Sequence, residues 1–230
     1  MSGKIIVAID GYSGTGKSST AKLVAKKLNY RFVDSGAMYR AVTLFFIRNG
    51  INCNDLISVN DALDKITIDF EIDVSEGKNN TLLNGVNVEN EIRGLEVSEK
   101  VSEISAISDV RKKMVEYQRS IGKSKGIVMD GRDIGTVVFP NAELKIFMTA
   151  DPNIRAQRRL KELAEKGQPS DLESVIRNLK ERDHIDSTRA DSPLVKAENS
   201  VVVDTSHLTF EEQVKKIVNL ALEKIKGSSI

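Results

Sequence analysis

The chain has few of the features that mark secreted, membrane or nucleic-acid-binding proteins. Its 230 residues include a single cysteine, Cys53, so no internal disulfide can form. No charged-then-apolar leader opens the sequence, and its apolar runs are strand-sized, short of the roughly 18 residues that a membrane span needs. The net charge is only +1, which provides no overall field to attract nucleic acid or an anionic membrane. We therefore expect a cytoplasmic protein without nucleic-acid or membrane partners, in which any anion site is local.

Metal-ligand spacing and repeats are also missing. Cys53, His184 and His207 stand alone, without other ligand-type residues at metal-binding intervals, and we interpret all three as structural. No internal repeat or low-complexity run occurs. A chain of this length can bury a large core. It suits one α/β domain with inserts better than two small domains.

The stretch from Gly11 to Ser18 reads G-Y-S-G-T-G-K-S and fits the phosphate-binding template G-x-x-x-x-G-K-[ST]. It follows the apolar run Ile5 to Ile9, which predicts a strand ending at Asp10. A helix that starts near Gly16 would leave a loop whose N–H groups point at one anion. Lys17 can then reach the β- and γ-phosphates of a nucleotide, and the Ser18 hydroxyl can hold Mg²⁺.

Strands and helices alternate along most of the remaining chain. Apolar runs predict further core strands at Tyr30–Val33, Gly126–Asp130, Leu144–Met148 and Val201–Val203. Helical spacing of apolar residues predicts helices at Gly16–Leu28, Ala37–Asn49, Leu95–Ser105, Asp109–Ile121, Asn153–Gly167, from Asp171 onward, and at Thr209–Lys226. This order is typical of a parallel sheet covered by helices.

One region departs from that order. Apolar and polar residues alternate from Ile66 to Asp73, which is typical of a half-buried antiparallel strand. The pair Asn84-Gly85 between Thr81–Leu83 and Val86–Val88 is a strong hairpin signal. We expect a small antiparallel sheet inserted at about residues 64–90, with a polar linker at residues 75–80.

Several charged residues stand where a ligand could meet them. Asp34 and Ser35 precede a helix, and capping alone would explain both. Tyr39 and Arg40, one turn into that helix, favour a nucleotide, because an arginine can fork onto a phosphate while a tyrosine packs on sugar or base. Asp130 ends a buried strand, where α/β sheets present residues to ligands. The glycine-bracketed loop at residues 131–136 follows it.

Two helices carry further arginines. Arg155, Arg158 and Arg159 share one face, which needs an anion or acids such as Glu162 nearby; a solvated face is the alternative. The helix from Asp171 has the apolar stripe Leu172, Val175, Ile176 and Leu179, which continues as Arg182, Asp186 and Arg189. A core-facing stripe that becomes ionic predicts a polar cleft, and an exposed ion pair is the alternative.

Five motifs together resemble the bacterial cytidylate kinases, a P-loop nucleoside monophosphate kinase family. They are G-Y-S-G-T-G-K-S at 11–18, D-S-G-A-M-Y-R at 34–40, D-G-R-D-I-G-T at 130–136, R-A-Q-R-R at 155–159 and K-E-R-D-H-I-D-S-T-R at 180–189. The resemblance implies a five-stranded parallel core sheet flanked by helices at residues 1–36, 126–152 and 168–230. It also implies a monophosphate-binding domain at 37–125, which includes the small sheet, and a helical lid at 153–167.

The resemblance also implies the site residues. ATP would be bound by Gly11, Tyr12, Ser13, Gly14, Thr15, Gly16, Lys17, Ser18 and Ser19, and Mg²⁺ by Ser18 with Asp34 and Asp130, through water. The acceptor CMP, and with it dCMP, would contact Ser35, Tyr39, Arg40, Ser102, Arg111, Arg132, Asp133, Arg182, Asp186 and Arg189. From position alone, Ser102 and Arg111 could equally be ordinary surface residues. Catalysis would fall to Lys17, Arg132, Arg158, Arg159, Arg182 and Arg189, in a monomer.

Phosphoryl transfer between two polyanions depends on positioning and charge neutralisation, which this set of cations could supply. Asp133 could accept a hydrogen bond from the exocyclic amine of cytosine, whereas uracil would present a carbonyl there. A UMP or AMP kinase is the nearest alternative. A P-loop switch protein would need the guanine-reading N-K-x-D, which is missing, and an RNA-binding regulator would need a basic stripe with aromatics.

The chain departs from the family at two positions. Tyr12 stands where the family usually has proline, which changes the expected stiffness of the loop but leaves the phosphate template intact. Lys196 lies in a stretch where proline is common, and we expect no consequence there.

Overall fold

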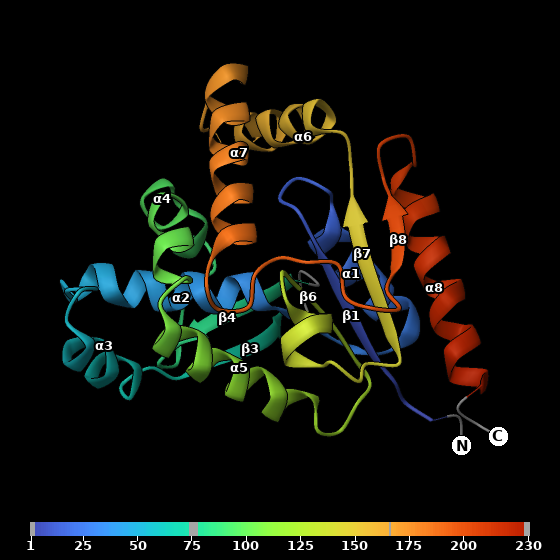
Figure 1. Ribbon diagram of the computed structural model, residues 1–230, viewed down its shortest axis with the longest axis horizontal. Coiled ribbons are helices and arrows are strands. Elements are labelled where there is room, and N and C mark those ends of the chain that lie inside the picture. The colour runs from blue at the N-terminus through green and yellow to red at the C-terminus, as the bar shows by residue number, and fades with distance from the viewer. Residues whose placement is uncertain (1–2, 74–77, 166, 228–230) are drawn as a thin grey trace. The chain divides into compact units, whose positions relative to one another are not determined.

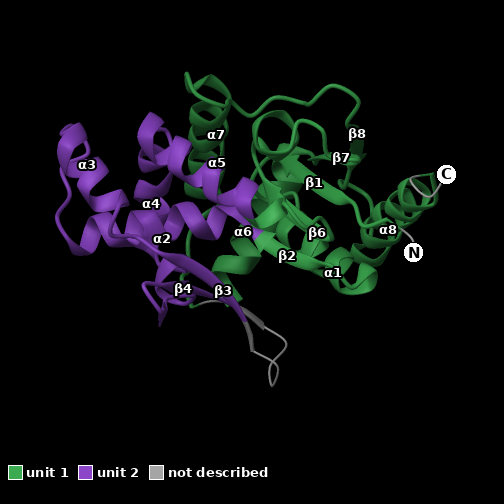
Figure 2. Ribbon diagram, turned by 90° about the horizontal axis from the view of Figure 1, so that it is seen from below, with its two compact units in different colours: residues 1–33, 121–230 green, residues 34–120 purple. Residues whose placement is uncertain are grey.

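The computed structural model describes residues 3–73, 78–165 and 167–227. The chain divides into two compact units, coloured separately in Figure 2. Unit 1 comprises residues 1–33 and 121–230, and unit 2 comprises residues 34–120. In the described part of the chain, no helix is long and apolar enough to cross a membrane.

Unit 1 is organised around a five-stranded parallel sheet (Figure 1). Its strands are β1 (Ile6–Gly11), β2 (Arg31–Asp34), β6 (Ile127–Gly131), β7 (Leu144–Thr149) and β8 (Val201–Asp204), in the order β2-β6-β1-β7-β8. The register pairs Asp10 with Gly131 and Gly11 with Met148. The predicted core strands are confirmed. Their carboxyl ends share one edge of the sheet, and the loops after β1 and β6 therefore begin side by side.

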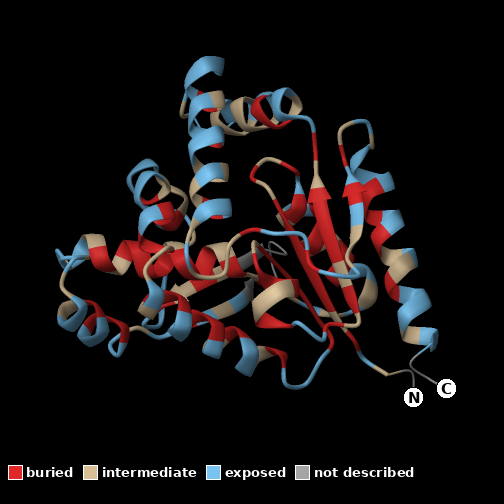
Figure 3. Ribbon diagram, viewed as in Figure 1, coloured by how far each residue is buried: buried red, intermediate tan, exposed pale blue. Residues whose placement is uncertain are grey.

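Two helices, α1 (Lys17–Leu28) and α8 (Phe210–Gly227), share one apolar core with this sheet. Ile9 and Ile146 from the sheet meet Val24 of α1 and Ile217 of α8 in that core, and each of the four is at most 1% exposed. Figure 3 shows the strands as the most buried part of unit 1. The sheet is therefore a rigid base for the loops at its edge.

Helices α6 (Pro152–Glu165) and α7 (Leu172–Thr188) pack on each other through a separate small cluster. Ala156 of α6 meets Val175 and Leu179 of α7 there. The predicted apolar stripe is confirmed at these two α7 positions but is wrong at Leu172, which is 40% exposed in the first turn. Further along α7 the stripe becomes ionic, and Asp186 is buried.

The described residues of unit 2 form the small antiparallel sheet and five helical segments. Its elements are α2 (Ser35–Arg48), α3 (Leu56–Leu63), β3 (Ile68–Asp73), β4 (Lys78–Leu83), β5 (Val86–Asn87), η1 (Glu91–Arg93), α4 (Leu95–Ile104) and α5 (Ser108–Gly122). Asn84 and Gly85 have φ values of 50° and 79°, as expected for the predicted hairpin turn. The predicted linker is too long. Residues 78–80 belong to β4, and residues 75–77 lie outside the described residues.

Three short elements were not predicted: α3, η1 and the π-helical turn η2 (Ile134–Val138) of unit 1. Helix α3 begins after Asp55, whose carboxylate accepts the N–H of Ile57. Leu56 and Ile57 are 60% and 75% exposed, and the helix therefore opens with two apolar residues that face solvent. Apolar periodicity cannot find a helix of this kind.

Candidate functional site

The loop after β1 has the backbone that its glycines allow. Gly11 has φ of 150°, and a Cβ there would lie 2.1 Å from the carbonyl oxygen of Met148 on β7. Gly16 caps α1 with φ of 82°. Neither position accepts a side chain without strain. The predicted order of strand, glycine loop and helix is confirmed, and α1 begins at Lys17.

Lys17 is buried at the base of this loop. Its Nζ donates a hydrogen bond to the carbonyl oxygen of Tyr12 at 3.3 Å, and the residue is 8% exposed. Burial, together with the nearby positive charge of Arg132, lowers the pKa of Lys17 to about 7 against the attraction of Asp130. A bound polyphosphate would restore the charged ammonium. The lysine is therefore placed where its charge depends on an anion.

Ser18 and Asp130 lie together, as their predicted role requires. The Ser18 Oγ donates to the Asp130 Oδ2 at 2.6 Å, which joins the start of α1 to the end of β6. Two neighbouring hard oxygens are a donor set that suits Mg²⁺ with water completing its shell. Among the described residues, no group of three or more Asp, Glu, His or Cys could hold a metal ion. The Ser18 and Asp130 oxygens could hold a Mg²⁺ that takes its other ligands from water and phosphate.

Asp34, the third predicted metal residue, has other partners within unit 2. Its Oδ1 accepts the N–H of Ala37 at 2.9 Å, and this caps α2. Its Oδ2 lies 2.8 Å from the Arg93 Nη2. The capping interpretation is confirmed for Asp34, and its metal role stays a prediction.

The loop after β6 meets the glycine loop and α7. Arg132 donates from Nε to the Asp186 Oδ2 at 2.7 Å and from Nη2 to the Ser13 Oγ at 2.7 Å. Asp133 is 3% exposed, and its Oδ1 lies 3.8 Å from the Arg189 Nη2. The structure thus brings five predicted residues from three segments into one buried cluster.

Arg182 of α7 lies among the same charges. Burial, together with the positive charges of Arg132 and Arg159, lowers its pKa to about 10 against the attraction of Asp186 and Asp183. The Nε of Arg182 is buried and has no hydrogen-bond acceptor among the described residues. Burial would raise the pKa of Asp186, but Arg132, Arg189 and Arg182 together outweigh burial and keep this pKa below its ordinary value. A cation without enough acceptors is a position where an anionic ligand would gain the most.

Sequence reasoning missed Asp10. Its two carboxylate oxygens accept the N–H groups of Ile134 and Gly135 at 2.8 and 2.7 Å, so that it anchors the loop that carries Arg132 and Asp133. Burial raises the pKa of Asp10 to about 6, although both backbone hydrogen bonds act against this. Its place at the end of a core strand, beside Gly131 in the register, was the available signal.

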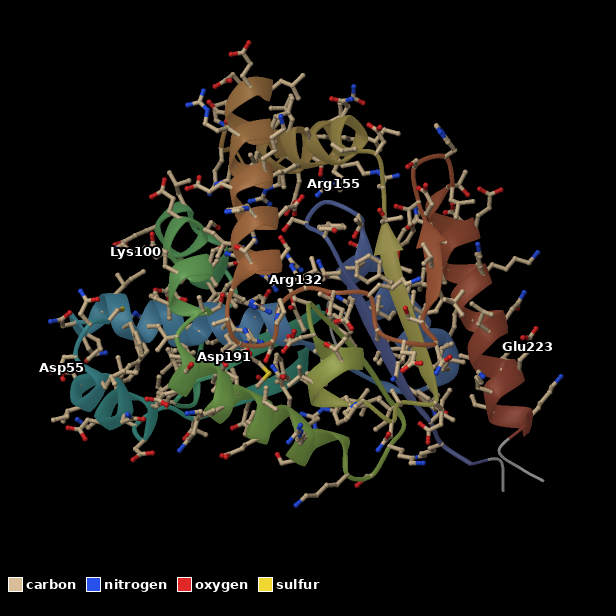
Figure 4. All side chains as sticks on the ribbon, in the orientation of Figure 1. Asp55, Lys100, Arg132, Arg155, Asp191 and Glu223 are labelled. Carbon is tan, nitrogen blue, oxygen red and sulfur yellow. The ribbon has the colours of Figure 1, made fainter. Side chains whose placement is uncertain are left out.

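The three arginines of α6 each have a separate partner. Arg155, labelled in Figure 4, is buried and donates to the Asp183 Oδ2 at 2.6 Å. Arg158 donates to the carbonyl oxygen and hydroxyl of Thr205 at 2.6 and 3.0 Å. Arg159 pairs with Glu162, the acid expected nearby, at 2.9 Å. The solvated-face alternative is wrong for Arg155, and the catalytic roles of Arg158 and Arg159 stay predictions.

In unit 2 the predicted acceptor residues gather around α2. Arg40 donates to the Ile92 carbonyl oxygen at 3.1 Å and to the Ser98 Oγ at 2.9 Å. The Arg111 guanidinium lies over the Tyr39 ring, 5.2 Å from its centroid. Arg111 and Ser102 are 2% and 7% exposed. The alternative that these two are surface residues is therefore wrong. Ser35, the first residue of α2, is also buried.

Comparison with known proteins points to one family. A family model described as cytidylate kinase matches residues 7–223. A cytidylate kinase of Bacteroides fragilis is 57% identical over 91% of this chain and 93% of its own length. A cytidylate kinase of Cytophaga hutchinsonii is 54% identical over 96% of this chain and 95% of its own length. A gluconokinase structure from Sinorhizobium meliloti 1021 matches with a TM-score of 0.47 at 14% identity, over 99% of this chain and 96% of that one. A structural match this weak adds nothing to the assignment.

Proposed function

The chain belongs to the cytidylate kinase family, and from this premise we propose that it transfers the γ-phosphoryl group of ATP to CMP and, in the same site, to dCMP. The observation that carries the mechanism is the cation-rich cluster of unit 1. Lys17 and Arg182, both with lowered pKa values, lie there with Arg132 beside the glycine loop. Two polyanions must come together in this reaction, and the cations reduce their repulsion.

The donor side is the glycine loop with Lys17 and Ser18. Its N–H groups and the Lys17 ammonium would bind the phosphates of ATP. Mg²⁺ would lie near Ser18 and Asp130, whose oxygens are 2.6 Å apart. When bound with ATP, the ion neutralises charge on the β- and γ-phosphates. Asp34 would contribute through water, because its two oxygens already accept from the Ala37 N–H and from Arg93.

Each unit carries predicted acceptor residues. In unit 1, Arg132, Arg182 and Arg189 would neutralise the acceptor phosphate and the group in transfer. In unit 2, Arg40 would bind an acceptor phosphate, and Ser35, Tyr39, Ser102 and Arg111 would bind the nucleoside. Asp186 would keep Arg132 and Arg189 in place, from 2.7 and 3.7 Å. Asp133 would accept a hydrogen bond from the cytosine amine and so select against uracil.

Closure of residues 153–167 over ATP would exclude water, which would otherwise hydrolyse the nucleotide. Arg159 would then leave its partly exposed partner Glu162 for the phosphates, since a surface pair of this kind contributes about 0–1 kcal/mol. Arg158 would have to leave Thr205 to do the same, which makes Arg159 the better candidate of the two for contact during transfer.

The experiment that tests this function is a coupled ADP-release assay on the purified protein with MgATP and, in turn, CMP, dCMP, UMP, AMP and GMP. We expect the largest specificity constant for CMP, with dCMP next. A larger constant for UMP or AMP would replace the proposal with the corresponding nucleoside monophosphate kinase. ADP release that no acceptor stimulates would favour a nucleotide-binding switch instead.

A further inference from the structure

Tyr12 is the residue of the glycine loop that departs from the family pattern, and its side chain makes two ring contacts. The ring meets Phe147 of β7 edge to face, with centroids 5.8 Å apart and planes at 85°. The Arg155 guanidinium lies over the same ring, with Cζ 5.2 Å from its centroid. Tyr12 therefore links the sheet, the glycine loop and α6 through its aromatic ring.

Arg155 is held in this position from several sides. Besides its pair with Asp183 of α7, its Nη1 donates to the Ser13 carbonyl oxygen at 3.3 Å. Its Nε is buried and has no hydrogen-bond acceptor in the described part of the chain. A guanidinium with an unsatisfied N–H gains from a π face, because the ring supplies part of the missing electrostatic stabilisation.

The first turn of α6 lies directly against the loop. A Cβ on Gly14 would come within 2.9 Å of the Arg155 carbonyl oxygen. A second connection runs in parallel: Arg158 binds Thr205, whose hydroxyl donates to the Thr15 carbonyl oxygen at 3.0 Å. Arg155 and Arg158, about one turn apart on α6, thus fasten the helix to the loop that would bind ATP.

We propose that Tyr12 is a positioning residue of the ATP site, whose ring holds Arg155 and thereby keeps the glycine loop and the first turn of α6 in one arrangement. The proposal rests on the proposed function for the donor site only. Proline would stiffen the loop through its own fixed φ, whereas tyrosine leaves the backbone free. In this chain the Tyr12–Arg155 contact supplies that stiffness through side chains instead. ATP then binds a loop that is already ordered, and the loop therefore loses less conformational freedom on binding.

The test is calorimetric titration of the full-length protein with MgATP and no acceptor, on Tyr12→Leu, Arg155→Met and the double variant. We expect Tyr12→Leu to raise the Kd for MgATP about three- to tenfold. The double variant should bind no more weakly than Arg155→Met, because the two residues act as a pair. In a Tyr12→Phe background, which keeps the ring, Arg155→Met should still cause its full loss. Arg177→Met, which removes an exposed α7 guanidinium, is the matched control and should leave the Kd unchanged.

Two results would overturn the proposal: a Kd for Tyr12→Leu within twofold of wild type, or losses in the double variant that multiply as for independent sites. Thermal unfolding of each variant, with Arg177→Met alongside, separates weaker binding from misfolding. If Arg155→Met does not fold, Arg155→Gln keeps a hydrogen-bond donor toward Asp183 without a cation over the ring and completes the cycle. Because no acceptor is present, failure of CMP phosphorylation would leave this test standing, whereas a wild-type protein that does not bind MgATP would overturn the donor site itself.

Discussion

Two partly buried arginines, one in each unit, differ in how well their charge is matched. Arg93 of unit 2 lies between two carboxylates, 2.8 Å from the Asp34 Oδ2 and 3.0 Å from the Glu89 Oε1. Burial alone would lower its pKa, but these two acids outweigh burial and raise it. Arg182 of unit 1 has the opposite balance, since burial and the neighbouring cation Arg132 lower its pKa to about 10.

The two environments indicate different roles. The Arg93 network is complete without a ligand: Glu89 also accepts the hydroxyl of Thr81 at 2.6 Å, so that η1, β4 and the start of α2 are tied together. Around Arg182, burial and the cations Arg132 and Arg159 outweigh the acids Asp186 and Asp183, and its Nε–H is buried without an acceptor among the described residues. A guanidinium whose charge is satisfied by its neighbours is typical of structure, and one whose charge is disfavoured is typical of a site that gains its counter-ion on binding.

The largest effect should come from removing charge at the unmatched cluster. We expect Lys17→Ala to lower turnover by at least about 10²-fold, because it removes a cation that acts on the transferring phosphate. Steady-state kinetics measure this, and CMP titration should give an unchanged affinity. Lys26→Ala, an exposed lysine of the same helix, is the control. Normal turnover in Lys17→Ala would contradict the donor-site assignment.

Asp133 tests whether a carboxylate inside this cluster reads the base. If it accepts the cytosine amine, Asp133→Ala removes a charged hydrogen bond of about 1.5–3 kcal/mol and weakens selection against UMP. The specificity constants for CMP and UMP, in wild type and variant, decide this. An equal loss for both acceptors would mean that Asp133 only orders its loop through Arg189, 3.8 Å away.

The comparison of the two arginines is sharpened by replacing each with methionine. Arg93→Met should lower the free energy of unfolding by about 1–3 kcal/mol, because it leaves Asp34 and Glu89 without their partner. Arg182→Met should leave unfolding within about 0.5 kcal/mol of wild type while reducing turnover. Denaturant titration of both variants measures this, with the exposed Arg48→Met as control. A larger loss of stability in Arg182→Met than in Arg93→Met would contradict the different roles of the two arginines.

The smallest expected effect is the uptake of less than one proton when MgATP binds. With a pKa of about 7, Lys17 is mostly neutral at pH 8, and bound phosphate should restore its charge. MgATP binding should therefore take up protons at pH 8, with little uptake at pH 6, where the lysine is already charged. Calorimetry in buffers of different ionisation enthalpy measures this. Uptake that persists in Lys17→Met would assign it to another group.

Local pattern was sufficient for much of the fold. The spacing of glycines, Lys17 and Ser18 encodes a backbone that turns after a strand, and apolar periodicity located all five strands of the core sheet. Helix α3 was missed because Leu56 and Ile57 face solvent, and periodicity reports only faces that are buried. A motif or a strand end marked several residues of the candidate site, such as Asp130, but Asp10 was missed although it also lies at the end of a core strand.

The amino-acid sequence by itself determined the glycine loop, the core strands, the hairpin at Asn84-Gly85 and the family, because each of these depends on residues close together in the chain. Only the tertiary structure decided which side chains and backbone groups contact one another. Asp10 meets the N–H of Gly135 across 125 residues, and Arg155 meets Ser13 across 142. Whether a buried charge is matched depends on which strand ends and helices come together. The same residue type therefore has its pKa raised by two acids at Arg93 and lowered by burial and neighbouring cations at Arg182.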